Sequence, residues 1–206
     1  MNLGCRPYNC NWKNDRLIMT SVRNQTWMIV RSTYSSPQTV GNSCEIYYLK
    51  VLFFVADLSL RGRFRSTITF LLESGTTVLA DRYAFSGIAF SASKGLPYEW
   101  CRGPDINLPA PDLTLFLDLA PEKARERGGY GEERYEKEEM QKRVRGVFEV
   151  IGTEMRTDNS SYRWVTVDAG EEKEAVQSAM WKHVEPLQNG IEGPIKRLWE
   201  SHLKPQ

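Results

Sequence analysis

The chain has 206 residues, a formal net charge of +1 and 41% hydrophobic residues, which is enough for one globular domain with a real core. A charge so close to zero argues against a protein whose main task is to neutralise a nucleic-acid backbone, and no apolar run approaches the roughly 18 residues of a membrane span. The four cysteines are scattered without C-x-x-C spacing, so they predict neither a zinc site nor a disulfide framework.

The first half of the chain shows clear periodicity only from about residue 60 onward. Before that point, Trp27–Val30 has the composition of one short strand, and Val51–Ala56 fits either a strand or a buried helical turn. Apolar residues then recur at helical spacing over Phe64–Leu72, and Gly75 predicts the end of this helix. The apolar run Thr76–Ala80 predicts a buried strand directly after it.

The second half alternates strand and helix patterns. Strands are predicted at Leu113–Leu117 and Trp164–Val167, and Pro121 suits the first turn of a helix. A long helix is predicted from the spacing of Met140, Val144, Val147, Phe148, Ile151 and Met155. A last helix is predicted from an apolar face of Ala175, Val176, Ala179, Met180, His183, Val184 and Leu187, which makes His183 a core histidine. This alternation predicts an α/β fold in which the three main strands run parallel and helices cover both faces.

The run Asp81-Arg82-Tyr83-Ala84-Phe85-Ser86-Gly87 follows the strand predicted at Thr76–Ala80. In open α/β sheets, ligands bind beyond the carboxyl ends of the strands. The acid could face a metal and the arginine a phosphate, because a guanidinium fork fits phosphate oxygens. On composition alone, an exposed turn with an ordinary surface ion pair is an equal alternative.

A second charged segment lies at residues 122–145, where eight basic and seven acidic side chains surround Gly128, Gly129 and Gly131. Such a segment is either a solvated helix pair with a flexible turn or a mobile lid that closes over a substrate.

These stretches resemble the thymidylate kinase family, whose members phosphorylate dTMP to dTDP, and the resemblance is closest to the eukaryotic branch. Besides Asp81–Gly87, three stretches carry it in the same order: Tyr98–Asp105 continuing through Leu108–Leu113, then Arg127–Glu136 with Gln141, and finally Trp164–Ala169. It covers roughly residues 64–200 and implies a P-loop-kinase-like parallel sheet flanked by helices. It also implies one domain over 1–206, with a divergent or poorly ordered segment at 1–60 and a lid at about 125–141.

The resemblance implies a set of site residues. The implied catalytic residues are Asp81, Arg82 and Glu136, with Asp81 also near the metal. The implied dTMP pocket consists of Arg82, Ser86, Gly87, Phe90, Tyr135 and Gln141. The implied ATP-binding lid residues are Arg127 and Arg134. It further implies Mg²⁺ with ATP as the phosphate donor, small-molecule nucleotides as partners, and a homodimer. The expected location is the cytoplasm, with the nucleus and mitochondrion left open, and neither nucleic acid nor a membrane is an expected partner.

Three residues near these motifs are expected to have structural roles. Phe85 is expected in the core, and Cys101 is expected to be a buried small hydrophobe because no histidine lies nearby to activate it. Asn107 stands where the family usually has glycine, and asparagine tolerates the left-handed conformation that such a turn needs.

The chain departs from the family pattern at the phosphate-binding loop. No Gly-Lys-Ser or Gly-Lys-Thr occurs in the sequence, so a loop of the type G-x-x-x-x-G-K-[ST] is missing, and the strand that precedes it is missing or replaced. Two alternatives remain open. The chain is an active kinase with a different phosphate clamp, or it is a catalytically impaired, kinase-derived nucleotide-binding or interaction protein.

Overall fold

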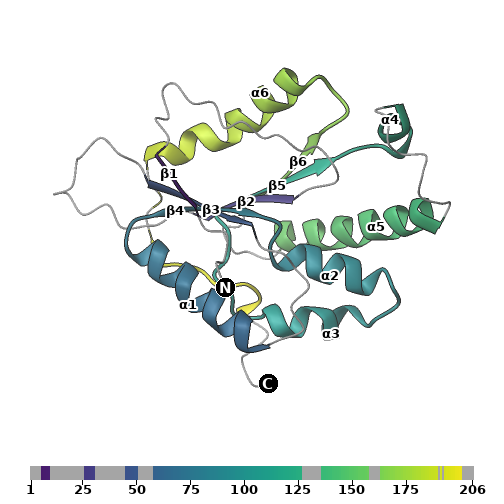
Figure 1. Cartoon of the computed structure of the whole chain (residues 1–206). Helices are drawn as coiled ribbons and strands as arrows, with labels where there is room; N and C mark the ends of the chain where they lie inside the picture. The colour runs from purple at the N-terminus through teal and green to yellow at the C-terminus, as the bar shows by residue number, and fades with distance from the viewer. Residues whose placement is uncertain are drawn as a thin grey trace.

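A computed structural model describes residues 6–9, 26–30, 45–50, 58–126, 136–157, 163–189, 191 and 193–200. They form a six-stranded sheet between two layers of helices, with α6 on one face and α1, α2, α3 and α5 on the other (Figure 1). The strands are β1 Arg6–Asn9, β2 Thr26–Val30, β3 Glu45–Lys50, β4 Thr77–Asp81, β5 Leu113–Asp118 and β6 Arg163–Asp168. The α-helices are α1 Leu58–Glu73, α2 Ala84–Ala92, α3 Tyr98–Arg102, α4 Pro121–Glu126, α5 Glu136–Thr157 and α6 Lys173–Val184, and short 3₁₀ helices span Gly103–Asp105 and Glu185–Asn189.

The sheet has the strand order β1-β3-β4-β2-β5-β6. β3 is parallel to β4 and β5 is parallel to β6, while β2 is antiparallel to both β4 and β5. β4, β5 and β6 therefore point in one direction within one sheet, which confirms the predicted parallel arrangement of these three strands. The strand predicted at Trp27–Val30 is also confirmed, as β2. Val51–Ala56, the segment with two alternatives, lies outside the described residues.

β2 lies in the middle of the sheet between β4 and β5, and it is antiparallel to both. Trp27 lies opposite Asp81 of β4, and Val30 lies opposite Val78. β2 thus begins at the carboxyl end of β4 and finishes at its amino end. β2 is therefore not oriented to lead into a phosphate-binding loop at the edge where β4 ends.

The two faces of the sheet carry two apolar clusters. Leu113, Leu115 and Leu117 of β5 pack on the α6 side, whereas Phe116 packs on the side of α2 and α5, because successive side chains of a strand alternate between faces. Both faces of β5 are buried, which fits its mostly apolar sequence. Phe85 is buried in the second cluster, as expected.

The α6 face differs in part from its prediction. Val176, Met180 and Val184 are buried as expected, but His183 is only half buried and its Nδ1 lies 3.0 Å from the Arg163 guanidinium. The expectation of a core histidine was wrong, because His183 lies at the edge of the apolar stripe rather than at its centre. Partial burial, together with the neighbouring charges of Arg163 and Lys182, lowers the pKa of His183.

No helix in the described part of the chain is both long enough and apolar enough to cross a membrane.

Ile151 and Val150 offer a matched test of the α5 packing, because Ile151 is 0% and its neighbour Val150 is 56% exposed. Ile151→Ala leaves a cavity in the core and should lower the free energy of unfolding by about 2–5 kcal/mol. Val150→Ala should change it by less than about 0.5 kcal/mol. Urea denaturation measures both, and equal losses would show that this face of α5 is not the buried one.

Candidate functional site

The junction between β4 and α2 holds the backbone in an unusual conformation. β4 ends at Asp81, α2 begins at Ala84, and Arg82 between them has φ = 61°. This left-handed conformation costs a non-glycine residue about 1–3 kcal/mol and persists where the surrounding structure enforces it. The turn places Arg82 at the carboxyl edge of the sheet, where open α/β sheets bind ligands.

Arg82 is suited to an anion. Its side chain is half buried, and within the described part of the chain it makes no hydrogen bond or ion pair. A guanidinium stays charged at all ordinary pH values, so a partly desolvated one favours an anionic partner. The nearby N-terminus of α2, a nine-residue helix whose N-cap residue Tyr83 makes no side-chain capping bond, adds the positive end of a helix dipole.

The first turns of α2 carry the other residues of the predicted run. Ser86 is buried, while Gly87 and Phe90 are half buried, and Phe90 lies one helical turn beyond Ser86. Phe85 points into the core, where its ring makes edge contacts with Trp164 at 5.3 Å and Trp199 at 5.8 Å between centroids. The helix thus has a core side held by Phe85 and a more accessible side with Gly87 and Phe90.

α5 contacts the end of α2 through Met140. Ser93, just after α2, donates its hydroxyl to the carbonyl oxygen of Phe90 at 3.0 Å, and the same hydroxyl oxygen lies 3.5 Å from Sδ of Met140. The first turns of α5, which carry Met140 and Gln141, therefore pack near the end of α2. Phe90 and Gln141 are 51 positions apart in the sequence.

The structure describes the remaining predicted site residues incompletely or not at all. Asp81 ends β4 and Glu136 begins α5, but the structure describes only their backbone. Arg127, Arg134 and Tyr135 lie outside the described residues, so the lid stays a prediction.

Two further aspartates end strands at the same edge. Asp118 of β5 and Asp168 of β6 are paired in register. Asp118 accepts a hydrogen bond from the Arg145 guanidinium at 2.6 Å, and Asp168 accepts one from the Gly170 N–H at 2.7 Å. Both carboxylates therefore already have protein donors. Sequence analysis missed the Arg145–Asp118 pair because no local spacing connects the two residues.

The residues at this edge are compatible with nucleotide-bound magnesium. No group of three or more His, Cys, Asp or Glu side chains that could hold a metal occurs in the described residues. Mg²⁺ needs no such cage when it is held by one or two carboxylates and by substrate phosphates. Asp81, whose backbone ends β4 at this edge, stays the predicted metal ligand.

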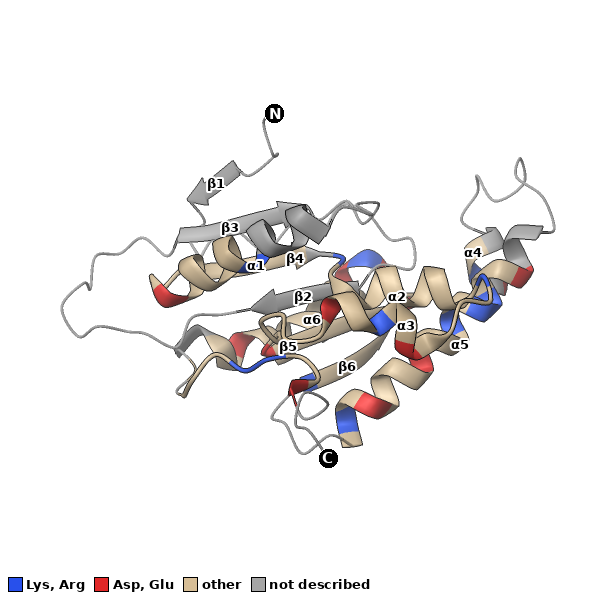
Figure 2. Ribbon diagram, turned by 90° about the horizontal axis from the view of Figure 1, so that it is seen from below, with Lys and Arg blue, Asp and Glu red and all other residues tan. Residues whose placement is uncertain are grey.

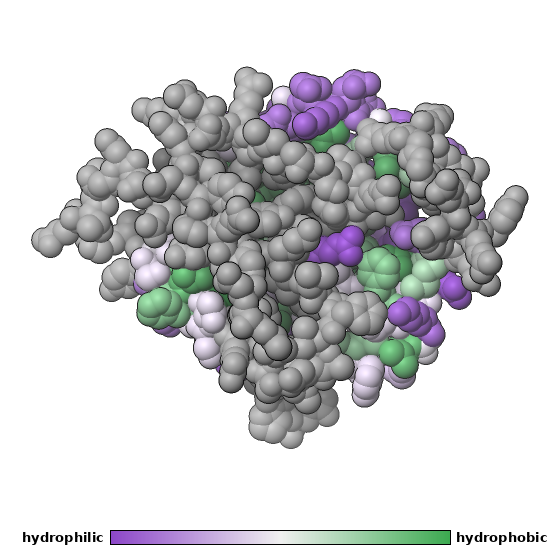
Figure 3. All heavy atoms as spheres, viewed as in Figure 1, coloured by the Kyte–Doolittle hydropathy of each residue, from purple (hydrophilic) through white to green (hydrophobic). Residues whose placement is uncertain are grey.

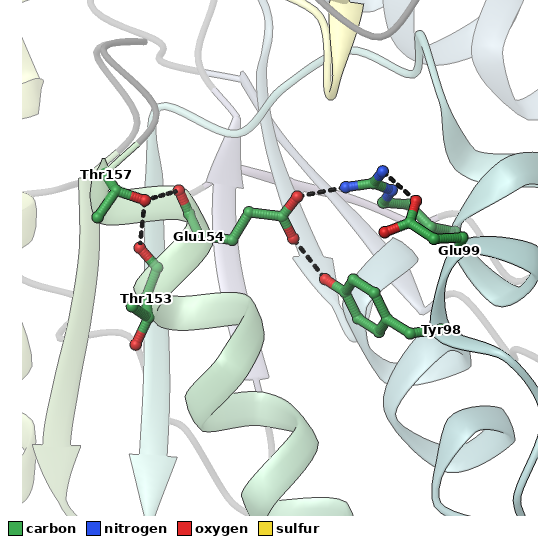
Figure 4. A network of polar contacts seen from close by, with 6 residues as sticks. Tyr98, Glu99, Thr153, Glu154 and Thr157 are labelled. Carbon is green, nitrogen blue, oxygen red and sulfur yellow. Dashed lines mark hydrogen bonds and ion pairs between the residues drawn. The ribbon is translucent and has the colours of Figure 1, made fainter.

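A polar network fastens α3 to α5, as Figure 4 shows. Glu154 of α5 accepts a hydrogen bond from the Tyr98 hydroxyl and pairs with Arg102, which also pairs with Glu99. Arg102 is buried, and its guanidinium lies over the Trp199 ring at 5.6 Å from the centroid. Burial, followed by the hydrogen bond to Glu154, raises the pKa of Tyr98.

The same segment bears out two expectations. Cys101 is buried, and burial raises the pKa of its thiol, which suits a packing role rather than a nucleophile. Asn107 has φ = 68°, so it does take the left-handed turn in place of glycine.

A groove of about 540 Å³ lies between α5 and the turn after α2, and Figure 3 shows apolar atoms on this side of the molecule. Its lining is mostly apolar, with two basic residues, Lys94 and Arg143, at its edge. In Figure 2 the basic segments of α5 gather toward the end of the helix beside α4.

An α/β sheet in which β4, β5 and β6 run parallel, with Arg82 just beyond the end of β4, fits the P-loop-kinase-like fold that the resemblance implies. Comparison with known proteins agrees: the sequence model of the thymidylate kinase family matches residues 42–180. The chain therefore belongs to the thymidylate kinase family. The match begins earlier and ends earlier than residues 64–200, the span over which the motifs were recognised.

Relatives from eukaryotes support this assignment. Thymidylate kinase of Arabidopsis thaliana is 43% identical over 139 residues, which is 66% of this chain and 50% of the relative. Thymidylate kinase of Schizosaccharomyces pombe is 50% identical over 115 residues, which is 54% of each. The solved thymidylate kinase of Candida albicans superposes with a TM-score of 0.55 at 29% identity, covering 68% of this chain and 69% of that one. The chain spans about half the length of the curated relatives it matches.

Glu154 and Glu149 allow a matched test of the α3–α5 network, since their side chains are 25% and 68% exposed. Glu154→Ala leaves the buried Arg102 without its main partner and should lower the free energy of unfolding by about 3 kcal/mol. Glu149→Ala removes a more exposed carboxylate and should cost less than about 0.5 kcal/mol. Thermal or urea unfolding compares the two, and similar costs would mean that Arg102 does not depend on Glu154.

Proposed function

We propose that this chain works as a thymidylate kinase, transferring a phosphoryl group from ATP to dTMP, and that dTMP binds at the junction of β4 and α2. The observation that carries the proposal is Arg82. It is held at φ = 61° beside the N-terminus of α2, half buried and without a partner in the described residues. Such a group suits a phosphate dianion, because the guanidinium fork binds two phosphate oxygens at once.

The pyrimidine end of the ligand would lie farther along α2. Gly87, next to the buried Ser86, allows the helix backbone to approach the nucleotide closely. The half-buried Phe90 offers an aromatic wall for the base, and Gln141 offers an amide that can pair with base oxygen and nitrogen atoms. Tyr135 and Glu136 would complete the acceptor side at the start of α5, as the family resemblance implies.

The donor side of the proposal depends on the lid and on magnesium. Arg127 and Arg134 would contact ATP, and Asp81 would hold Mg²⁺ together with phosphate oxygens. Magnesium bound there would neutralise charge on the donor phosphates. Homodimer formation and a cytoplasmic location are proposed on the family resemblance alone.

A second candidate, a nucleotide-binding protein with little turnover, is favoured by the direction of β2. A phosphate-binding loop follows a strand at its carboxyl end, and there the N–H groups of the next helix meet the phosphates. The carboxyl end of β2 lies at the opposite edge of the sheet from Arg82. Since the sequence also contains no Gly-Lys-Ser or Gly-Lys-Thr, this polypeptide carries the acceptor half of the family's site without its usual donor clamp.

The affinity for dTMP tests the acceptor site. Arg82→Ala removes a charge-assisted phosphate contact worth about 1.5–3 kcal/mol, so calorimetry should show roughly ten- to a hundredfold weaker dTMP binding. Thymidine, which lacks the phosphate, should bind wild type and variant equally. Arg156→Ala, at the exposed far end of α5, is the control and should leave dTMP affinity unchanged. Equal dTMP affinities of wild type and Arg82→Ala would remove Arg82 from the site.

Turnover decides between the two candidate functions. An active kinase should turn over within the usual range of about 1–100 per second. A nucleotide-binding protein without a preorganised donor clamp should fall well below it, because positioning and electrostatics supply nearly all of the catalysis in phosphoryl transfer. The assay follows dTDP formation from ATP, Mg²⁺ and dTMP, with an Asp81→Ala, Arg82→Ala double variant as the blank. Turnover within that range, lost in the double variant, would reveal a phosphate clamp of another kind in this chain.

A further inference from the structure

Tyr83, the residue after Arg82, is buried and joined to a distant part of the chain. Its side chain is 3% exposed, and its hydroxyl donates a hydrogen bond to the carbonyl oxygen of Pro109 at 3.1 Å. Burial, and secondly the charge of Asp105, raises the pKa of this phenol, so it remains a protonated donor throughout the physiological range. None of the roles assigned so far uses this hydroxyl.

The acceptor of this bond is itself held in place. Residues 195–199, here called the C-terminal strap, run antiparallel to the segment around Pro109, with Pro109 opposite Arg197. Three backbone hydrogen bonds of 2.8 Å flank Pro109: Asn107 N–H to Leu198 O, Leu198 N–H to Leu108 O, and Ala110 N–H to Lys196 O. The Pro109 carbonyl is therefore a fixed point rather than part of a free loop.

The C-terminal strap is anchored in the core. Leu198 and Trp199 are fully buried, and the Trp199 ring makes an edge contact with Phe85 of α2 and lies under the Arg102 guanidinium. The strap thus contacts the helix that follows Arg82 as well as the segment that receives the Tyr83 hydroxyl. Both contacts link residues that are far apart in the sequence to the same short junction.

Arg82 lies between two fixed points. On one side Asp81 is held in the sheet, opposite Trp27 of β2 and Lys50 of β3. On the other side Tyr83 is held by its ring in the core and by its hydroxyl on Pro109. A left-handed φ at a non-glycine residue relaxes unless both neighbours are constrained, and relaxation would redirect the side chain.

We propose that Tyr83 is a positioning residue: its hydroxyl, fixed on Pro109 by the C-terminal strap, maintains the turn that directs the Arg82 guanidinium toward an anionic ligand. For the phosphate of dTMP this inference rests on the proposed function. Loss of one such neutral hydrogen bond is worth about 0.5–1.5 kcal/mol, so Tyr83→Phe should weaken dTMP binding about two- to tenfold.

The test is a double-mutant cycle with a matched control. Tyr83→Phe keeps the buried ring and should reduce affinity for dTMP but not for thymidine, and the reduction should vanish in the Arg82→Ala background. Tyr98→Phe makes the same chemical change at a half-buried tyrosine, whose hydroxyl bonds to Glu154, and should leave dTMP affinity unchanged. A loss that Tyr83→Phe and Tyr98→Phe share, or that persists without Arg82, would mean a general loss of stability and would overturn the proposal.

A second measurement separates this inference from the proposed function. Crystal structures of wild type and Tyr83→Phe should show Arg82 at positive φ in wild type, and relaxed to negative φ or in two conformations in the variant. If wild type binds no dTMP, the proposed function fails. The comparison of Arg82 φ in wild type and Tyr83→Phe still tests whether Tyr83 positions Arg82. An unchanged Arg82 conformation in Tyr83→Phe would overturn the positioning role regardless of what binds.

Discussion

The pairing of β2 between β4 and β5 is the constraint on which the rest of the architecture depends. β4 and β5 point the same way but do not touch each other, so each would present a row of unpaired N–H and C=O groups at the buried centre of the sheet. Burying such groups without hydrogen-bond partners costs free energy. A strand that pairs with both β4 and β5 therefore stabilises the sheet in either direction. An antiparallel strand meets this demand as fully as a parallel one. Its direction nevertheless has a large chemical consequence, because it decides which edge of the sheet receives the loop that follows.

Because β2 is antiparallel to β4, the edge beside Arg82 includes the ends of β3, β4, β5 and β6 and the beginning of β2. The ends of β5 and β6 carry aspartates that already bond to Arg145 and to a backbone N–H. The end of β4 carries Arg82, whose charge has no described partner. In the proposed function, anion binding at this edge is therefore concentrated at the junction of β4 and α2.

The junction depends on contacts with distant parts of the chain. Tyr83 reaches Pro109, Ser93 reaches Met140, and Arg102 reaches both Glu154 and Trp199. These contacts join α2, α3, α5 and the C-terminal strap into one support beneath the site. A binding site gains from such rigidity, because a side chain that is already directed toward its ligand loses little entropy on binding.

The sequence by itself determined the local elements and the family. Helical spacing located α5, and Gly75 at φ = 87° ended the turn after α1. The run Asp81–Gly87 predicted a ligand site from its residue types and its place after an apolar strand. Only the tertiary structure decided the direction of β2, the half-buried position of His183 and the partners of Arg102 and Arg145. A strand of five residues has the same alternation of side chains when read in either direction, so no pattern within Thr26–Val30 reveals which way it runs. Ion pairs between residues 118 and 145, or 102 and 154, likewise have no local signature, because folding brings their partners together through the packing of whole helices.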